Sequence, residues 1–153
     1  MTPPSRKPEL TRVEGLVWAL DDEPDMVTTL GAVLEESSFD FRGFTEPDDL
    51  FEALQQETPQ LLLLDLMMPA MPGTDVLRKL RRRPETEQLP VLVLTALSSE
   101  SSILNAFDAG ADDVVQKPFS VPELLARITW HVRRRRQMRN LRRRSRDMQM
   151  LAE

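Results

Sequence analysis

The sequence contains no cysteine and a single histidine, His131, among its 153 residues. The absence of cysteine excludes disulfide bonds, thiolate metal sites and cysteine nucleophiles, and one histidine argues against a histidine-based metal site or catalytic dyad. No apolar run is long enough to span a membrane, and residues 1–12 are polar and proline-rich, unlike a signal peptide. We therefore expect a cytoplasmic protein without a membrane anchor.

The formal net charge of −5 hides a division between two parts of the chain. From Arg127 onward there are 10 basic and 2 acidic residues, a net charge of +8, whereas the first 126 residues hold 10 basic and 23 acidic residues, a net charge of −13. An acidic body thus carries a basic tail, and the two need separate interpretation. The length suits one domain with a real core and leaves no room for a second.

After a polar lead-in at 1–13 that we expect to be disordered, strand-like and helix-like patterns alternate. This alternation predicts a doubly wound α/β fold, a five-stranded parallel sheet with right-handed crossovers. Neither GxGxxG nor GxxxxGKS occurs, so nothing supports a dinucleotide or P-loop site. The predicted strands are 16–20, 39–44, 61–66, 91–95 and 114–116, and the predicted helices are around 24–34, from Pro47, 74–83, 99–109 and from near Ser120 to about Leu151.

The run from Leu61 to Leu64 has no alternation of apolar and polar residues, as in a central strand covered on both faces. Asp65 follows at the carboxyl end of this strand, the edge where open parallel sheets form ligand crevices. Four further polar residues follow the other strands, and the fold should bring them to the same edge: Asp21, Asp22, Thr95 and Lys117.

Three carboxylates at one edge repel one another, by about 4 kcal/mol per pair at ~4 Å and an effective dielectric constant of ~20. They therefore share protons or hold a cation. Oxygen ligands without histidine or cysteine indicate Mg²⁺, with Mn²⁺ as a substitute. Lys117 and the Thr95 hydroxyl suit phosphoryl oxygens, and Asp65 can act as the nucleophile that forms an aspartyl phosphate. Taken singly, these residues also fit an acidic helix cap, a strand-end hydrogen bond and a solvated lysine.

Five short motifs occur in this order: Asp21-Asp22, Asp65-Leu66-Met67-Met68-Pro69 with Gly73, Thr95-Ala96, Gly110-Ala111-Asp112-Asp113 and Lys117-Pro118-Phe119. Together they resemble the receiver domain of two-component response regulators over roughly residues 14–132. The resemblance implies a flavodoxin-like sheet of order 2-1-3-4-5 and Mg²⁺ held by Asp22 and Asp65, assisted by Asp21 and the Met67 carbonyl. It implies a switch that catalyses the transfer of a phosphoryl group to its own Asp65 from a histidine kinase or phosphotransfer protein, without turnover of a metabolite. It also implies a cis Lys117–Pro118 bond.

One position departs from this family. Val114 stands three residues before Lys117, where the family usually has a tyrosine or phenylalanine that swings inward on activation. Because valine has no ring, we expect phosphorylation to alter the face of the fourth helix, fifth strand and last helix by a smaller or different route. Two rival classes of protein would need residues that this sequence lacks. An aspartyl-nucleophile phosphohydrolase would place an acid two residues past Asp65, where Met67 stands, and a flavin-binding module would need a Ser/Thr/Gly loop after the first strand.

The basic tail, residues 133–153, has no helix breaker, so we expect the last helix to project from the domain as a linker. Nine arginines fall within residues 133–146, and the apolar residues Met138, Leu141, Met148 and Leu151, with Ser145 in the gap, fit a short coiled-coil seam. We expect a homodimer through this helix, leading to an output domain beyond Glu153 that is missing from this chain. The alternatives are nucleic-acid binding by the arginines, which we do not favour because no aromatic residues interleave, and a solvated, frayed end.

Two further charged groups attract notice. Arg81, Arg82 and Arg83 end a predicted helix, where cations suit the helix dipole, and no partner need be invoked for them. Glu123 and Arg127 are four residues apart on the last helix, so we expect an ion pair.

Overall fold

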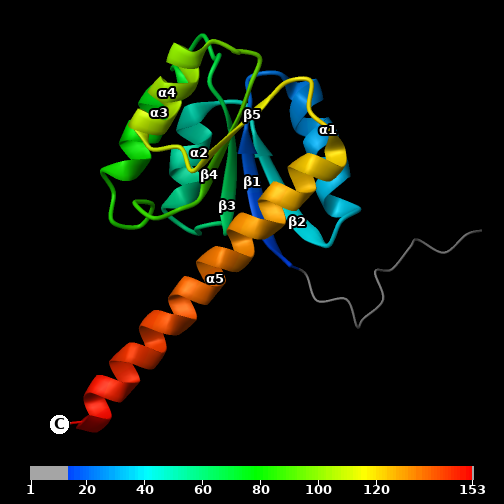
Figure 1. Cartoon of the computed structure of the whole chain (residues 1–153). Helices are drawn as coiled ribbons and strands as arrows, with labels where there is room; N and C mark the ends of the chain where they lie inside the picture. Colours follow the sequence, from blue (N-terminus) through cyan, green and yellow to red (C-terminus); the bar gives the residue numbers. More distant parts are fainter. Residues whose placement is uncertain (1–13, 153) are drawn as a thin grey trace, which may run out of the picture.

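A computed structural model describes residues 14–152 as five parallel strands alternating with five helices (Figure 1). The predicted disordered lead-in lies outside the described residues. No helix within this range is both long and apolar enough to cross a membrane. The elements are β1 (Gly15–Leu20), α1 (Pro24–Glu35), β2 (Phe39–Phe44), α2 (Pro47–Leu54), β3 (Leu61–Asp65), α3 (Gly73–Arg81), β4 (Val91–Thr95), α4 (Glu100–Ala109), β5 (Asp113–Gln116) and α5 (Val121–Ala152).

The sheet has the order β2-β1-β3-β4-β5, and every neighbouring pair is parallel. Alternate residues of the strands point to opposite faces, so Leu61 and Leu63 pack with α1 and α5, whereas Leu62 and Leu64 pack with α2, α3 and α4. All of β3 is buried, because it lies at the centre of the sheet with helices on both faces. The predicted fold class and strand order are confirmed.

Most helices and strands begin and end within two residues of their predicted positions. Pro24 and Pro47 occupy the first turns of α1 and α2, where the missing N–H costs no hydrogen bond. Ser99 caps α4 by accepting a hydrogen bond from the Ser102 N–H, and Gly110 ends it with a left-handed backbone, φ 118°. β3 ends at Asp65 and not at residue 66, because no further backbone pairing with β4 follows that position.

Helix α5 has two halves with different surroundings. Its inner half packs Leu124, Ile128 and Val132 against the sheet, and each is at most 1% exposed. Beyond Val132 the helix projects from the domain as a straight rod that ends at Ala152 (Figure 1), and arginines of its first turns still donate hydrogen bonds to Glu14 and Gln88. The predicted projection of the last helix is therefore present in the structure.

Candidate functional site

Three aspartates meet at the carboxyl edge of the sheet, as the strand ends predict. Asp21 and Asp22 follow β1 and Asp65 ends β3, and one carboxylate oxygen from each lies within 4.8 Å of the other two. Asp21 and Asp65 are nearly inaccessible, with 2% and 7% exposure, while Asp22 is half-buried. Three formal negative charges are thus held close together in a site that is largely screened from water.

Lys117 reaches this cluster from the end of β5. Its Nζ donates to Asp21 Oδ2 at 3.0 Å and lies 3.9 Å from Asp65 Oδ1. The backbone positions this side chain, because the Lys117 N–H donates to the Thr95 carbonyl at 2.8 Å. The bond from Lys117 to Pro118 is cis. One ammonium group offsets only part of the charge of three carboxylates, so the site has a net negative charge.

Close packing of the loop after β3 fixes the orientation of Asp65. The Met67 N–H donates to Asp65 Oδ1 at 3.2 Å, and the Met67 side chain points outward with 55% exposure. At the start of α3, a Cβ on Gly73 would lie 2.5 Å from the Asp65 carbonyl oxygen and 2.6 Å from the Leu66 Cα. Only glycine permits this approach of the helix to the strand end, which explains why a glycine stands at position 73 of the motif.

The surroundings of Asp65 change its acidity. Burial is the largest cause and raises the pKa of its carboxyl group, and the nearby charges of Asp21 and Asp22 act in the same direction. The Met67 N–H and the Lys117 ammonium oppose this effect by stabilising the ionised form, but the pKa still lies above its ordinary value. An ionised Asp65 is therefore held at an energetic cost unless further positive charge arrives.

The donor set fits a divalent cation. Magnesium prefers carboxylate, carbonyl and water oxygens, and this edge offers three carboxylates with an exposed rim at Asp22. Among residues 14–152, this is the one group of three or more acidic, histidine or cysteine side chains close enough to hold a metal ion. The three aspartates predicted from the sequence for Mg²⁺ are thus brought together.

Thr95 and Val114 lie on the next two strands. Thr95 is 1% exposed at the end of β4, and its hydroxyl accepts a hydrogen bond from the Leu97 N–H at 3.1 Å. Val114 is half-buried on β5 and lines a hollow of about 390 Å³ together with Ile103 and Phe107 of α4. The small side chain at position 114 thus borders an open hollow next to α4.

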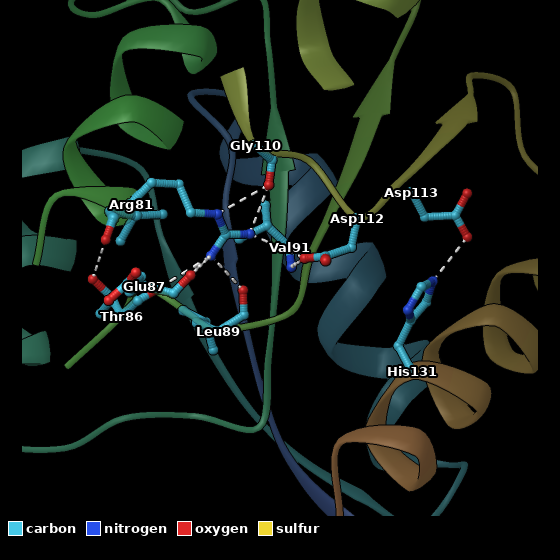
Figure 2. A network of polar contacts seen from close by, with 10 residues as sticks. Arg81, Thr86, Glu87, Leu89, Val91, Gly110, Asp112, Asp113 and His131 are labelled. Atoms are coloured by element: carbon cyan, nitrogen blue, oxygen red, sulfur yellow. Dashed lines mark hydrogen bonds and ion pairs between the residues drawn. The ribbon is translucent and has the colours of Figure 1, made fainter. Parts of the chain in front are cut away.

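Arg81 has specific partners, although its place at a helix end did not require any. Its guanidinium donates to four backbone carbonyls, those of Thr86, Glu87, Leu89 and Gly110, and also to Asp112 Oδ2 at 3.0 Å (Figure 2). Asp112 in turn accepts from the Val91 N–H at 2.8 Å. The sequence suggested only a helix-end charge, because these partners become neighbours only after α3, β4 and β5 assemble.

A second network joins α5 to the first residue of β5. Asp113 accepts from Arg127 at 3.0 and 3.1 Å and pairs with His131 Nε2 at 3.0 Å (Figure 2 shows the histidine contact). Arg127 also pairs with Glu123 at 3.1 Å, which confirms the ion pair predicted on this helix. Burial opposes ionisation of Asp113, but the hydrogen bonds from His131 and Arg127 outweigh it and keep the pKa of its carboxyl group below the ordinary value.

Comparison with known proteins agrees with this geometry. The sequence model of the family described as "Response regulator receiver domain" matches residues 17–129. The phosphate regulon transcriptional regulatory protein PhoB of Rhizobium meliloti is 41% identical over 118 residues, which is 77% of this chain and 52% of that protein. The chain spans about half the length of the curated relatives it matches.

Solved receiver domains have the same fold. The Francisella response regulator 1452 receiver domain superposes with a TM-score of 0.73 and 26% identity, covering 78% of this chain and 98% of that one. A BeF3-activated DrrB receiver domain gives a TM-score of 0.68 and 31% identity, covering 78% and 97%. With the family match, the strand order and the acidic cluster in agreement, this chain belongs to the response regulator receiver domain family.

Proposed function

We propose that this receiver domain accepts a phosphoryl group on Asp65 from the phosphohistidine of a histidine kinase or phosphotransfer protein, in a reaction that depends on Mg²⁺. The observation that carries the proposal is the position of Asp65 between two carboxylates and one ammonium group, with oxygens within 4.8 Å and Nζ at 3.9 Å. We assign this exchange to the cytoplasm, as expected from the sequence. The domain acts on itself and turns over no metabolite.

The two oxygens of Asp65 are not equivalent. Oδ1 accepts from the Met67 N–H and faces Lys117, whereas no described residue donates a hydrogen bond to Oδ2. Oδ2 is therefore suited to attack phosphorus. The P–O bond to Asp65 forms as the P–N bond of the phosphohistidine breaks, and the electron pair of that bond returns to the donor imidazole.

Asp22 and Asp65 would hold the cation, with Asp21 and the Met67 carbonyl assisting, and Mn²⁺ would substitute. When bound, Mg²⁺ supplies positive charge that offsets the carboxylates and the phosphoryl oxygens. Lys117 is a second source of positive charge, and it must shift from Asp21 toward the phosphoryl group to use it. The Thr95 hydroxyl, buried at the next strand end, can donate to another phosphoryl oxygen.

The direct test is incubation with acetyl phosphate and Mg²⁺, followed by mass spectrometry of the intact chain. We expect the wild type to gain one phosphoryl group, which it loses again on incubation with hydroxylamine, as acyl phosphates do. Asp65→Asn should gain none. Asp75→Asn is a matched control, because Asp75 is an exposed carboxylate on α3, 55% accessible and paired with Arg78, and this variant should react like the wild type. A wild type that takes up no phosphoryl group, or takes it up equally in Asp65→Asn, would refute the assignment.

A phosphohydrolase with an aspartyl nucleophile is the rival enzyme class. Such an enzyme needs an acid two residues after the nucleophile, and that position is held by the exposed Met67. We therefore expect no sustained release of phosphate from small phosphomonoesters. Steady release that disappears in Asp65→Asn would favour the hydrolase instead.

We propose that the signal passes from Thr95 to the face formed by α4, β5 and α5 by a route that does not involve an aromatic ring at position 114. The hollow beside Val114 gives Ile103 and Phe107 room to repack when Thr95 moves toward the phosphoryl group. Beryllofluoride with Mg²⁺ should shift backbone amide resonances within residues 95–127. Shifts confined to other parts of the chain would contradict this route.

We also propose a division of the chain into a disordered lead-in at 1–13, the receiver domain at 14–132, and an extension at 133–153. Val132 is the last buried residue of α5, and every later residue with a described side chain is exposed except the half-buried Arg135. We propose that the extension forms a homodimer and leads to an output domain beyond Glu153. Nucleic-acid binding by its arginines remains the alternative, and retention of duplex DNA that weakens steeply with salt would favour it.

A further inference from the structure

The outer half of α5 presents two different stripes of side chains. Along one side, the apolar residues Met138, Leu141 and Met148 are 43%, 59% and 71% exposed. At 100° per residue, the opposite side of the helix is formed by arginines three or four residues apart. These are Arg136, Arg139, Arg143 and Arg146. The apolar stripe is thus separated from the densest positive charge and is available for contact.

The spacing of the apolar stripe assigns a heptad register. Met138 and Ser145 take position a, and Leu141 and Met148 take position d, giving four consecutive layers of a seam with one polar layer. Leu151, 87% exposed, flanks this seam at position g. Arg139 and Arg146 take position b and Arg143 takes position f, so these charges point away from a partner helix.

The flanking e and g positions decide how two copies would align. In a parallel pair, Gln137 at g faces Arg142 of the second copy at e, and Arg144 at g faces Gln149 of the second copy. Each facing pair couples one arginine with one neutral amide. In the antiparallel alignment that matches all four layers, Arg142 faces Arg142 of the second copy, and Arg144 likewise faces its own equivalent. Like charges in contact oppose that alignment.

The seam cannot continue toward the domain. One heptad before Met138, position a is His131, which is bonded to Asp113 of its own chain, and position d is Arg134, whose guanidinium lies 5.1 Å from the Trp130 ring centre. Neighbouring residues on this segment also bind within the chain, because Arg133 and Arg136 both contact Glu14. Two copies must therefore separate before residue 137.

We propose that the outer part of α5 pairs with the same segment of a second copy as a parallel two-stranded coiled coil that begins at Met138, with Met138, Leu141, Ser145 and Met148 each facing its own equivalent. Charge at the flanking positions selects the parallel alignment, and the internal bonds of His131 and Arg134 set its beginning. This inference specifies the homodimer of the proposed function and does not require that Asp65 be phosphorylated.

The short seam has a consequence for control. From Met138 to Met148 it extends only about 15 Å, and one of its four layers is the polar Ser145, so the helices alone associate weakly. Both receiver domains lie at the same end of a parallel pair, so any attraction between them raises the effective concentration of one helix near the other. We therefore expect a weak basal dimer that activation at Asp65 strengthens.

Disulfide trapping tests the alignment, and the natural absence of cysteine makes single-cysteine variants clean reporters. In the full chain, Leu141→Cys places a thiol in the seam, and Arg143→Cys places one two residues away at the outward position f. At equal concentration under mild oxidation, we expect the Leu141→Cys dimer to form at least about tenfold faster, because pairing holds its thiols within disulfide distance. Light scattering on the wild type and on Leu141→Arg gives a second measure, with dimer expected only for the wild type.

A mixture of Leu141→Cys and Ser145→Cys distinguishes the two alignments. A parallel pair yields mainly 141–141 and 145–145 disulfides, whereas the antiparallel pair yields 141–145. Equal rates for Leu141→Cys and Arg143→Cys, or a majority of 141–145 products, would overturn the inference. Adding Asp65→Asn to Leu141→Cys keeps this test independent of phosphorylation. Disulfides should form at the same rate as in Leu141→Cys alone without beryllofluoride, and only the faster disulfide formation expected with beryllofluoride and Mg²⁺ should be lost.

Discussion

Replacing Asp65 by asparagine should make the metal-free protein more stable while removing its function. Asparagine keeps the shape of the side chain and an oxygen that can accept from the Met67 N–H, so the main change is the loss of one negative charge. With 4.8 Å as the largest separation within the cluster, each repulsion with Asp21 or Asp22 is about 3.5 kcal/mol at an effective dielectric constant of ~20. The attraction to Lys117 at 3.9 Å is about 4 kcal/mol on the same scale.

The two repulsions exceed this attraction by about 3 kcal/mol. Water at the half-buried Asp22 screens part of the difference, so we expect the free energy of unfolding of Asp65→Asn to exceed that of the wild type by about 1–2 kcal/mol at pH 7. Urea unfolding with a chelator present measures this value. Asp75→Asn, which changes an exposed carboxylate with 55% accessibility, should stay within about 0.5 kcal/mol of the wild type.

The sign of the pH dependence is a further part of this prediction. The folded protein raises the pKa of Asp65, so it binds this proton more tightly than the unfolded chain does. The contribution of Asp65 to wild-type stability therefore falls as pH rises above 3.8, the ordinary value, through the raised pKa, and the advantage of Asp65→Asn appears over that window. Mg²⁺ at a hundredfold excess over its Kd should restore about 2.7 kcal/mol to the wild type and much less to the variant. A variant less stable than the wild type at pH 7, or equally stabilised by Mg²⁺, would refute the reasoning.

Three other predictions concern the networks around α3 and α5. Arg81→Lys should lower the free energy of unfolding by about 2–3 kcal/mol, because an ammonium group cannot reach four carbonyls and a carboxylate together; Arg82→Lys, at an exposed neighbour, should change urea unfolding little. Asp113→Asn should lower the free energy of unfolding by about 1 kcal/mol above pH ~4, because it weakens the pairs with Arg127 and His131. Since the pKa of Asp113 is lowered in the fold, that difference should disappear as pH falls through the lowered value. Gly110→Ala should lower the melting temperature, because φ is 118° and the new Cβ would lie 2.7 Å from the Arg81 Cγ; an unchanged value would contradict the packing described for Arg81.

Much of the fold could be read from local patterns. The leucines of β3 and the residues of β4 are apolar on both faces, which is the signature of a covered parallel sheet, and the prolines and Gly110 mark helix ends through backbone restrictions that act within a few residues. The acidic site was also predictable, because parallel strands deliver their last residues to one edge whatever lies between them. Asp21, Asp65, Thr95 and Lys117 each end or follow a strand, so their convergence required only that the sheet form.

What the sequence by itself determined, then, is the sheet, its functional edge and the two-sided pattern of the last helix, since these depend on periodicity and on strand ends. Only the tertiary structure decided which charged groups pair away from that edge. Arg81, Arg82 and Arg83 look alike in the sequence, yet Arg81 alone of the three bonds to the Gly110 carbonyl, 29 residues away, and to Asp112. Likewise, Asp113 meets His131 from 18 residues away because β5 and α5 are packed together. Such pairs depend on the paths of loops and on the rotation of helices, which no local pattern specifies.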